Sequence, residues 1–460
     1  MNHRIGRLLG AWMVGCAVLA LAATYYQGVI ADRLASSPAN PRVANAEKSV
    51  WRGSILDRNG EILAESTERG LDSRVYRGPG SLAPLVGYAH LTLGKSGLES
   101  AMDPWLAGRG WSYSRIGLLS TISQQPDRGY SVRLTIDSRT QRACEAALAG
   151  RRGAAVVVDA ASGEVLAVAS CPWVHPALLE SAWDTVIARE DSPLICRPLA
   201  GLYPPGSTIK PAIAGAAIDM GLAGSGTVYD CRGSIRAGGT IISDASGAHG
   251  NIDLETAIAL SCNTAFVHLA LEAGPRLPEA LFGFYLSRSL PLEAPTAVGM
   301  LSGKASDDAL GQLAIGQGDL VVTPLHVAMI AAAVVNHGVM MRPRLVAEIR
   351  SVGGAVVKRS SPSVLCVPMS AEAARIVAGG MRDAVEWGTA RAASLPEYAV
   401  GGKTGTAENP HGAPHAWFVG YAQHAGRKVV LSIIIENGGS GGQVAAPLAG
   451  SIFRAVLSGR

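Results

Sequence analysis

The sequence feature that most constrains the fold is an apolar run at the N-terminus, where no charged residue occurs between residues 8 and 31. At ~1.5 Å per residue, a helix of this length reaches across a hydrocarbon core of ~30 Å. Arg4 and Arg7 precede the run, and such a basic flank is typical of a cytoplasmic end. The run predicts a single-pass anchor over residues 1–34, with a cytoplasmic N-terminus and the rest of the chain outside the cytoplasm.

Two other interpretations of this run stay open. The small residues 20–23 ("ALAA") offer a cleavage site, as in a secretory signal peptide. A buried core helix fits less well, because the run is terminal and apolar on all sides. Tyr25 and Tyr26 lie near its far end, where interfacial aromatic residues of a membrane span collect. Anchor and signal peptide both predict that the remainder is exported.

Composition separates this chain from several functional classes. Of its 460 residues 48% are hydrophobic and 17% are charged, which is typical of a folded chain with two or three domains. The net charge of +4 is small for this length, and no basic run interleaved with aromatic residues occurs. We therefore expect no nucleic-acid partner.

The region after the apolar run divides into a linker and a small domain. Residues 35–46 are polar and contain prolines, as in a linker that leaves a membrane. Asn59-Gly60 between alternating apolar residues is a strong hairpin signal. "SVRLTIDSRTQRACEAALAG" predicts a strand and then a helix capped by Asp137 or Ser138. We expect a membrane-proximal, dimerisation-like pedestal domain over residues 47–150.

Residues 151–460 predict one large domain. A hairpin about Ser162-Gly163 begins it, strands at 416–422 and 428–437 come near its end, and residues 446–457 predict a closing helix. Alanine-rich helical stretches lie between these strands. Strands at both ends of a helical region indicate a sheet completed by distant segments. The predicted class is α/β, with a mostly antiparallel sheet flanked by helices.

The seven cysteines carry no metal-binding spacing. Cys16 lies in the predicted anchor, and none of the others forms a CxxC pair. A disulfide between Cys171 and Cys196 stays open in an oxidising compartment, beside the simpler interpretation that these are small buried residues. We expect no metal ion and no cofactor.

Three local patterns resemble known motifs but lack their required context. "VGGKTG" has Glu397 where a phosphate-binding loop needs a glycine, and no helix signal follows the lysine. "GGSGG" around Ser440 matches a nucleophile elbow, yet neither an acid nor a histidine follows it. His411 and His415 lie in a Gly/Pro loop, where we expect them to help position substrate rather than bind metal.

Three short motifs remain, and their order and setting give them weight together. The first begins a predicted helix after "YPPG", the second lies at a helix start or turn, and the third lies on an extended run. Their residues are Ser207 and Lys210 (SxxK), Ser261 and Asn263 (SCN), and Lys403, Thr404 and Gly405 (KTG).

The chemistry of a serine nucleophile explains these residue types. A hydroxyl needs a base within hydrogen-bond reach, and a spacing of three on a helix places Lys210 beside Ser207. A free lysine has a pKa of ~10.4, which must fall by about three units for it to act near neutral pH. Burial and the nearby cation Lys403 would both lower that pKa. Ser261 would relay the proton, and Asn263 would bind a substrate amide and hold Lys210.

The third motif predicts substrate binding. Lys403 offers charge to a substrate carboxylate, and Thr404 and Thr406 offer hydroxyl groups, with Gly405 between them. The backbone N–H groups of Ser207 and Thr406 would form an oxyanion hole, helped by the helix N-terminus.

With these motifs the chain resembles the class B penicillin-binding proteins, which are monofunctional peptidoglycan transpeptidases. The resemblance includes residues 52–66, 94–108 and 132–141 in the pedestal, and 248–270, 313–338 and 401–422 in the catalytic domain. With only about a hundred residues in the pedestal, the chain is similar to the short penicillin-binding protein A or division-type members.

That resemblance implies a function and a location. The substrate would be a stem peptide ending in D-Ala-D-Ala, Ser207 would be acylated with release of D-Ala, and an amine of a neighbouring stem would resolve the acyl-enzyme. β-Lactams would trap the same serine. It also implies a place in the bacterial inner membrane, beside a polytopic glycan polymerase, in cell-wall synthesis for division or cell shape.

Two alternative functions stay open at this level. In a D,D-carboxypeptidase or β-lactamase, water would resolve the acyl-enzyme, and Glu272 and Glu279 after the second motif leave room for a hydrolytic base. A non-catalytic β-lactam-binding scaffold would be expected to have lost motif residues, yet all three motifs are intact.

Overall fold

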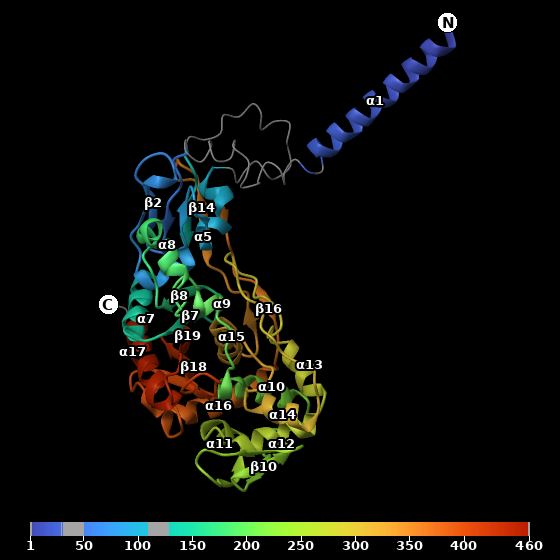
Figure 1. Cartoon of the computed structure of the whole chain (residues 1–460). Coiled ribbons are helices and arrows are strands. Elements are labelled where there is room, and N and C mark those ends of the chain that lie inside the picture. The colour runs from blue at the N-terminus through green and yellow to red at the C-terminus, as the bar shows by residue number, and fades with distance from the viewer. Residues whose placement is uncertain (1, 29, 31–49, 109–127, 459–460) are drawn as a thin grey trace.

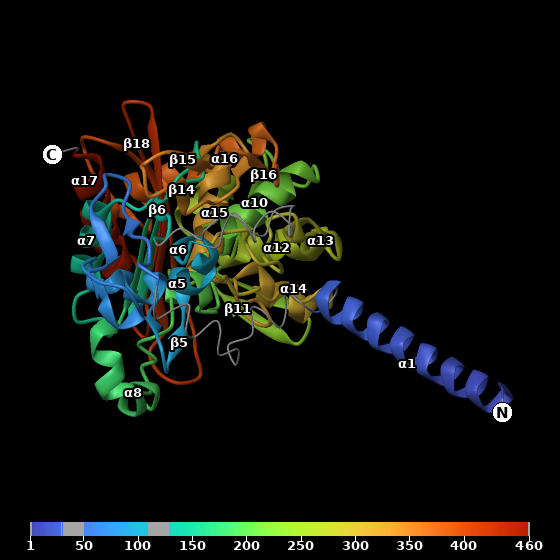
Figure 2. The ribbon, with the colours of Figure 1, turned by 90° about the horizontal axis from the view of Figure 1, so that it is seen from above.

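The computed structural model describes residues 2–28, 30, 50–108 and 128–458 (Figure 1). The predicted linker over residues 35–46 lies outside the described residues. Helix α1 (Asn2–Gly28) projects away from the body of the protein in both views (Figures 1 and 2). Its segment Arg4–Tyr26 is long and apolar enough to span a membrane, and none of that segment is buried against the protein. The interpretation as a buried core helix is therefore wrong.

The membrane-proximal region is built on a six-stranded sheet of order β15-β14-β6-β1-β2-β3. Strands β1 (Ile55–Leu56) and β2 (Ile62–Ser66) form the hairpin predicted about Asn59-Gly60. Gly60 has a φ of 91°, which favours glycine. The other strands are β3 (Arg74–Tyr76), β6 (Ser131–Leu134), β14 (Val346–Arg350) and β15 (Val356–Arg359).

Two of these strands come from far along the chain. β14 pairs antiparallel with β6, and β15 pairs with β14, so residues beyond 340 complete a sheet begun before residue 60. The domain boundary placed at residue 150 stays a prediction, but the sheet itself crosses that position.

The central sheet has the order β17-β18-β19-β7-β8, and every neighbouring pair is antiparallel. The first and last parts of this domain meet where β19 pairs with β7, as the pattern of strands at both ends predicts. The predicted class is thereby confirmed. The strands are β7 (Gly153–Asp159), β8 (Val165–Cys171), β17 (Ala399–Ala407), β18 (His415–His424) and β19 (Arg427–Ile435).

Helices cover both faces of the central sheet (Figure 2). On one face α7 (Ser138–Leu148), capped by Asp137 as predicted, packs with α17 (Ala446–Leu457) against a buried cluster that includes Phe418 and Phe453. On the other face, α15 (Pro324–Val335) and α16 (Ala371–Glu386) pack with Trp417 and Val419. Successive residues of β18 thus point to opposite faces, as strand geometry requires.

A helical region lies beyond α15 and α16 and carries two small two-stranded sheets. Its helices are α10 (Lys210–Asp219), α11 (Leu254–Ala259), α12 (Asn263–Ala273), α13 (Arg276–Phe282) and α14 (Asp307–Ala314). The small sheets pair β9 (Val228–Cys231) with β12 (Gly250–Asp253) and β10 (Ser234–Ala237) with β11 (Thr240–Ser243).

The remaining elements are short. They are α4 (Ala83–Val86), β4 (Ala89–His90), β5 (Gly94–Lys95), α5 (Gly97–Ala101), α6 (Asp103–Leu106), α8 (Leu179–Ile187), α9 (Arg197–Ala200), β13 (Met340–Met341) and β16 (Val364–Cys366). Single turns of tighter or wider helix lie at η1 (Leu71–Ser73), η2 (Gly80–Leu82), η3 (Pro176–Leu178), η4 (Gly206–Ile209), η5 (Arg391–Ala393) and η6 (Gly441–Ala445).

Candidate active site

Ser207 lies in the 3₁₀ turn η4, directly before α10. The helix predicted after "YPPG" is present, although its first turn is 3₁₀ and the α-helix begins at Lys210. The turn is held by two hydrogen bonds: the Gly206 N–H donates to Gly316 O (3.0 Å), and Trp417 Nε1–H donates to Pro204 O (3.1 Å). Ser207 itself is half-buried.

Lys210 is fully buried and points to the second motif. Its Nζ donates to Ser261 O (2.7 Å) and to Asn263 Oδ1 (2.7 Å), and lies 3.4 Å from Ser261 Oγ. Within the described part of the chain, Nζ makes no hydrogen bond to Ser207 Oγ and no ion pair with a carboxylate. The structure thus brings Lys210 of the first predicted motif together with Ser261 and Asn263 of the second.

Burial is the largest cause of the altered pKa of Lys210. It lowers that pKa from 10.5 to about 7, against the smaller opposing influence of Cys262 and Asp244. We expected Lys403 to contribute to this lowering, but it is not among the causes that act on Lys210. The repulsion between the two lysines instead affects Lys403. Burial is the main cause that lowers the pKa of Lys403 well below its usual value, and the charge of Lys210 lowers it further. A substrate carboxylate beside Lys403 would oppose this lowering and favour its charged form, whereas Lys210 has no such partner among the described residues.

The second motif lies in the turn between α11 and α12. Ser261 has a φ of 60°, in the left-handed region, and so aims its carbonyl and hydroxyl at Lys210. Asn263 is held from behind, because its Nδ2–H donates to Ser243 O (2.8 Å) and its backbone N–H donates to the Asp244 carboxylate. Asp244 also accepts from the Thr264 N–H (3.3 Å). Sequence reasoning missed Asp244, which lies outside all three motifs.

The third motif lies on the edge strand β17, extended as predicted. A Cβ at Gly405 would lie 2.9 Å from Thr208 Cγ2 and 3.0 Å from Pro205 O, so a larger residue would push the strand away from the serine turn. Lys403 is fully buried and donates to Thr404 O (3.1 Å). The motif therefore closes one side of the site against η4.

The two threonines differ in their surroundings. The buried Thr404 hydroxyl donates to Thr389 Oγ1 (3.1 Å), and Thr389 Oγ1 donates to Ala259 O (3.2 Å). Thr406 is exposed, and its Oγ1 accepts from the Gly441 N–H (3.4 Å). Thr389 was also missed by sequence reasoning, because it lies in an ordinary helix-to-strand connection. Gly441 belongs to the glycine turn around Ser440, which therefore supports the third motif.

The other candidates have simpler roles. His415 Nδ1 accepts from the Asn437 N–H (3.1 Å), and its ring lies edge-on to Tyr203 with ring centroids 5.7 Å apart. Cys171 and Cys196 are free thiols.

The fold and the three motifs together define a serine acyltransferase of the penicillin-recognising class. The comparison with known proteins agrees. The description "Penicillin binding protein transpeptidase domain" matches residues 153–457, and "Penicillin binding protein A dimerisation domain" matches residues 52–132. This chain belongs to the penicillin-binding protein transpeptidase family, and its organisation is that of a class B member.

Named relatives and solved structures extend the match to nearly the whole chain. Peptidoglycan D,D-transpeptidase PbpA of Mycolicibacterium smegmatis is 31% identical over 99% of both chains, and PbpA of Mycobacterium tuberculosis is 32% identical over 100% of both. The penicillin G acyl-enzyme complex of M. tuberculosis penicillin-binding protein A covers 89% of this chain and all of that one, with a TM-score of 0.79 and 31% identity.

Proposed function

We propose that this protein is a peptidoglycan D,D-transpeptidase whose acyl-enzyme forms on Ser207. The observation that carries the assignment is the buried Lys210 ammonium, one helical turn from Ser207 and bound by Ser261 and Asn263. Burial lowers the pKa of this lysine to about 7, so its neutral amine is accessible near neutral pH and can accept a proton. Relatives over the full chain carry the name peptidoglycan D,D-transpeptidase, and homologous structures contain β-lactam acyl-enzymes.

The reaction follows from these positions. Ser207 Oγ attacks the carbonyl carbon of the penultimate D-Ala of a stem peptide, and Lys210 takes the hydroxyl proton directly or through Ser261. The tetrahedral intermediate collapses, the proton passes to the leaving nitrogen, and D-Ala departs. The amine of a neighbouring stem then attacks the ester, its proton returns to Ser207 Oγ, and a new amide cross-links the two stems. A β-lactam ring opened by Ser207 keeps its leaving group attached.

The other motif residues bind the substrate and the developing charge. Asn263 would bind the stem-peptide amide, while Lys403, Thr404 and Thr406 would bind the terminal carboxylate along β17. The backbone N–H groups of Ser207 and Thr406 would stabilise the oxyanion. A Cβ placed on Gly206 would lie 3.0 Å from Thr406 O, which shows how closely the turn approaches the strand. Losing one oxyanion donor costs about 100- to 1,000-fold in rate.

Transfer to an amine is favoured over hydrolysis by the surroundings of the candidate bases. Glu272 is exposed on α12, where its carboxylate lies 3.9 Å from His268 Nε2, and Glu279 is exposed on α13. Neither forms a hydrogen bond with Ser261 or Lys210 in the described part of the chain. A hydrolytic base would have to come from elsewhere.

The membrane arrangement is part of the proposal. Helix α1 would span the inner membrane once, with Arg4 and Arg7 on the cytoplasmic side and the catalytic domain outside. The protein would act there with a polytopic glycan polymerase in wall synthesis for division or cell shape.

The test is the intact mass of the full-length protein in detergent after addition of penicillin. We expect a penicillin-sized gain in the wild type that persists for many minutes and is absent in Ser207→Ala. Ser440→Ala, which alters the decoy serine, should keep the adduct. An adduct that disappears rapidly would favour the hydrolase. No adduct on folded wild-type protein would overturn the assignment of Ser207.

The same protein then tests transfer. With a D-Ala-D-Ala donor peptide and an amine acceptor, we expect a cross-linked product that depends on the acceptor. Product formed by water alone, with no change on adding the amine, would identify a carboxypeptidase.

A further inference from the structure

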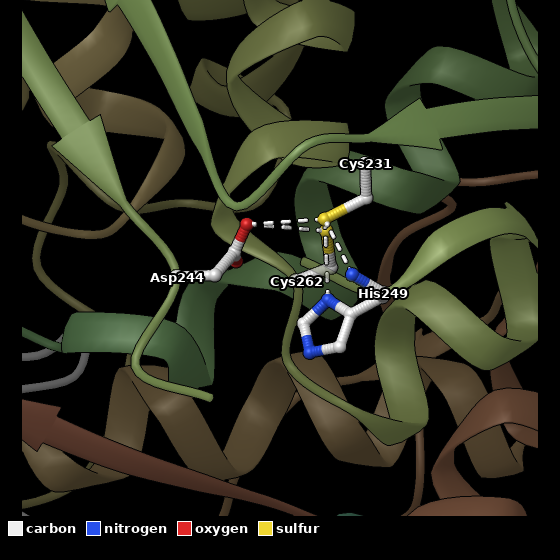
Figure 3. Close-up of side chains that lie close together, drawn as sticks. All are labelled: Cys231, Asp244, His249 and Cys262. Carbon is white, nitrogen blue, oxygen red and sulfur yellow. Dashed lines mark hydrogen bonds between the residues drawn. The ribbon is translucent and has the colours of Figure 1, made fainter. Parts of the chain in front are cut away.

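Four side chains with metal-binding atoms converge behind the second motif (Figure 3). Cys231 ends strand β9, Asp244 follows β11, His249 precedes β12, and Cys262 lies in the turn between α11 and α12. Their ligand atoms all lie within 4.8 Å of one another. The two cysteines are fully buried and Asp244 is nearly so.

Three of the distances between these ligand atoms match the edges of a tetrahedral zinc site. Cys231 Sγ lies 3.3 Å from Asp244 Oδ2 and 3.3 Å from His249 Nδ1, and Cys262 Sγ lies 3.7 Å from Asp244 Oδ2. Zinc bonds of ~2.3 Å to sulfur and ~2.0–2.2 Å to nitrogen or oxygen require ligand separations of about 3.3–3.8 Å. The three separations above fall in this range, and all four ligand atoms lie within 4.8 Å of one another.

Groups around the cluster hold the ligand atoms in place. His249 Nε2 lies 3.0 Å from Ser246 Oγ, which leaves Nδ1 facing the cluster. Cys231 Sγ accepts from the His249 N–H (3.4 Å), and Cys262 Sγ accepts from the Ala265 N–H (3.4 Å). N–H donors of this kind stabilise thiolates, and a hydrogen bond to the second imidazole nitrogen orients a metal-binding histidine.

We propose that Cys231, Asp244, His249 and Cys262 bind one Zn²⁺ ion. Two thiolates, an imidazole and a carboxylate form a mixed soft and borderline set that suits zinc, and four protein ligands leave no open position, as in a structural site. This proposal replaces the expectation of no metal. The expectation rested on the absence of CxxC spacing, whereas the fold collects ligands from four separate positions between residues 231 and 262.

A bound ion would stabilise the region of small sheets around the cluster. The small sheets β9–β12 and β10–β11 have two strands each, and β9 alternates exposed with buried residues. Two-stranded sheets are marginally stable by themselves in water. An ion bound at Cys231 and Cys262 would join this region to the α11–α12 turn, and its binding free energy would add to the stability of the fold.

The site also bears on catalysis, and this part rests on the proposed function. Cys262 lies between Ser261 and Asn263, which hold Lys210, and Asp244 accepts from the Asn263 N–H. The zinc ligands therefore act as positioning residues for the proton relay. Loss of the ion would let this turn move and would slow acylation by ~10- to 100-fold, the usual effect of losing supporting groups at a site.

The experiment measures zinc in the full-length protein in detergent, purified with added Zn²⁺ under reducing conditions, by elemental analysis. We expect one zinc per chain in the wild type and a loss in Cys231→Ser and His249→Ala. Cys366→Ser, which changes a half-buried thiol outside the cluster, should keep the ion. Cys231→Asp replaces the thiolate with a carboxylate, which can also bind zinc. We expect this variant to retain zinc and rapid acylation even if Cys231→Ser folds poorly.

The outcomes separate this inference from the proposed function. Wild-type protein that holds no more zinc than Cys231→Ser, or that contains a Cys231–Cys262 disulfide instead, would overturn the site. Removal of zinc by a chelator with no change in the rate of penicillin acylation would overturn the positioning role. A zinc-loaded wild type that forms no penicillin adduct would overturn the assignment of Ser207 and leave the zinc site standing.

Discussion

The charged cluster near the membrane and the two lysines of the active site are both buried, but their surroundings differ. Near the membrane, Glu99 is fully buried and its two carboxylate oxygens lie 2.6 Å from Arg52 Nε and 2.6 Å from Arg74 Nε. Asp103 lies 2.5 Å from Arg52 Nη1 and 2.9 Å from Lys95 Nζ. In the catalytic region, the buried lysines Lys210 and Lys403 form no ion pair with a carboxylate among the described residues.

The consequence is visible in the pKa values. Burial would raise the pKa of Glu99, but Arg74 and Arg52 outweigh it and hold that pKa below its usual value, so the carboxylate stays charged. For Lys210, burial dominates and lowers the pKa to about 7. A paired buried charge secures the architecture, whereas an unpaired buried ammonium supplies a neutral amine that can act as a base.

The largest effect is expected from keeping the charge at Lys210 and removing its ability to titrate. Lys210→Arg should lower the rate of penicillin acylation by about 100- to 10,000-fold, because a guanidinium stays protonated and cannot act as a general base. The measurement is the second-order rate of labelling with a fluorescent penicillin. Lys304→Arg changes an exposed lysine and should leave that rate as it is. Rapid labelling of Lys210→Arg would exclude Lys210 as the base.

Breaking the paired cluster should affect stability rather than chemistry. Glu99→Gln leaves Arg52 and Arg74 buried without their carboxylate, and should lower the free energy of unfolding by ~3–5 kcal/mol. Chemical denaturation of the full-length protein measures this. Glu65→Gln, which breaks the exposed Arg77–Glu65 pair (2.7 Å), should cost less than ~1 kcal/mol. Equal effects of the two changes would refute the contrast between the two regions.

Acidification should protonate Lys210 and so abolish its action as a base. A carboxylate placed beside Lys210 should cause this protonation at a higher pH. Lys210 is protonated below its pKa, so the acylation rate should fall as pH drops through about 7. Asn263→Asp places a carboxylate beside Nζ and should raise that pKa by roughly 1–3 units, with at least a ~10-fold slower rate at neutral pH. The pH profile of labelling measures both. Asn59→Asp, in an exposed turn, should leave the midpoint in place, and an unmoved midpoint in Asn263→Asp would contradict the argument.

The smallest effect concerns a hydrogen bond at the border of the site. Thr389→Val removes the acceptor of the Thr404 hydroxyl and the donor to Ala259 O. A loss of ~0.5–1.5 kcal/mol should reduce acylation several-fold. Labelling rates of Thr389→Val and of the exposed control Thr67→Val provide the comparison. A reduction beyond ~100-fold would mean that Thr389 has a direct role.

Local features of the fold could be predicted because their causes lie within a few residues. The hairpins about Asn59-Gly60 and Ser162-Gly163, the Asp137 cap and the extended KTG strand are all present. Turn geometry, capping and strand alternation depend on neighbouring residues, so single-sequence patterns show them.

Many contacts between residues far apart in the chain could not be predicted from the sequence. The hydrogen bond between Arg133 and Glu348, where β6 meets β14, spans 215 residues, and no local pattern marks it. The same holds for Asp244 and Thr389, which support the motifs without belonging to them. Their polar side chains are ordinary for loops, and only packing places them next to Asn263 and Thr404.

The sequence by itself determined which groups are available for chemistry: a serine three residues before a lysine, a second serine with an asparagine, and a KTG strand. Tertiary structure decided what those groups can do. The pKa of Lys210 depends on burial by segments far apart in the chain, and the cluster of Cys231 and Cys262 exists only because the end of β9 meets the turn between α11 and α12. The residue types set the intrinsic reactivity of each side chain. The exclusion of water from Lys210 and the approach of Cys231 to Cys262 depend on packing, which requires the folded chain.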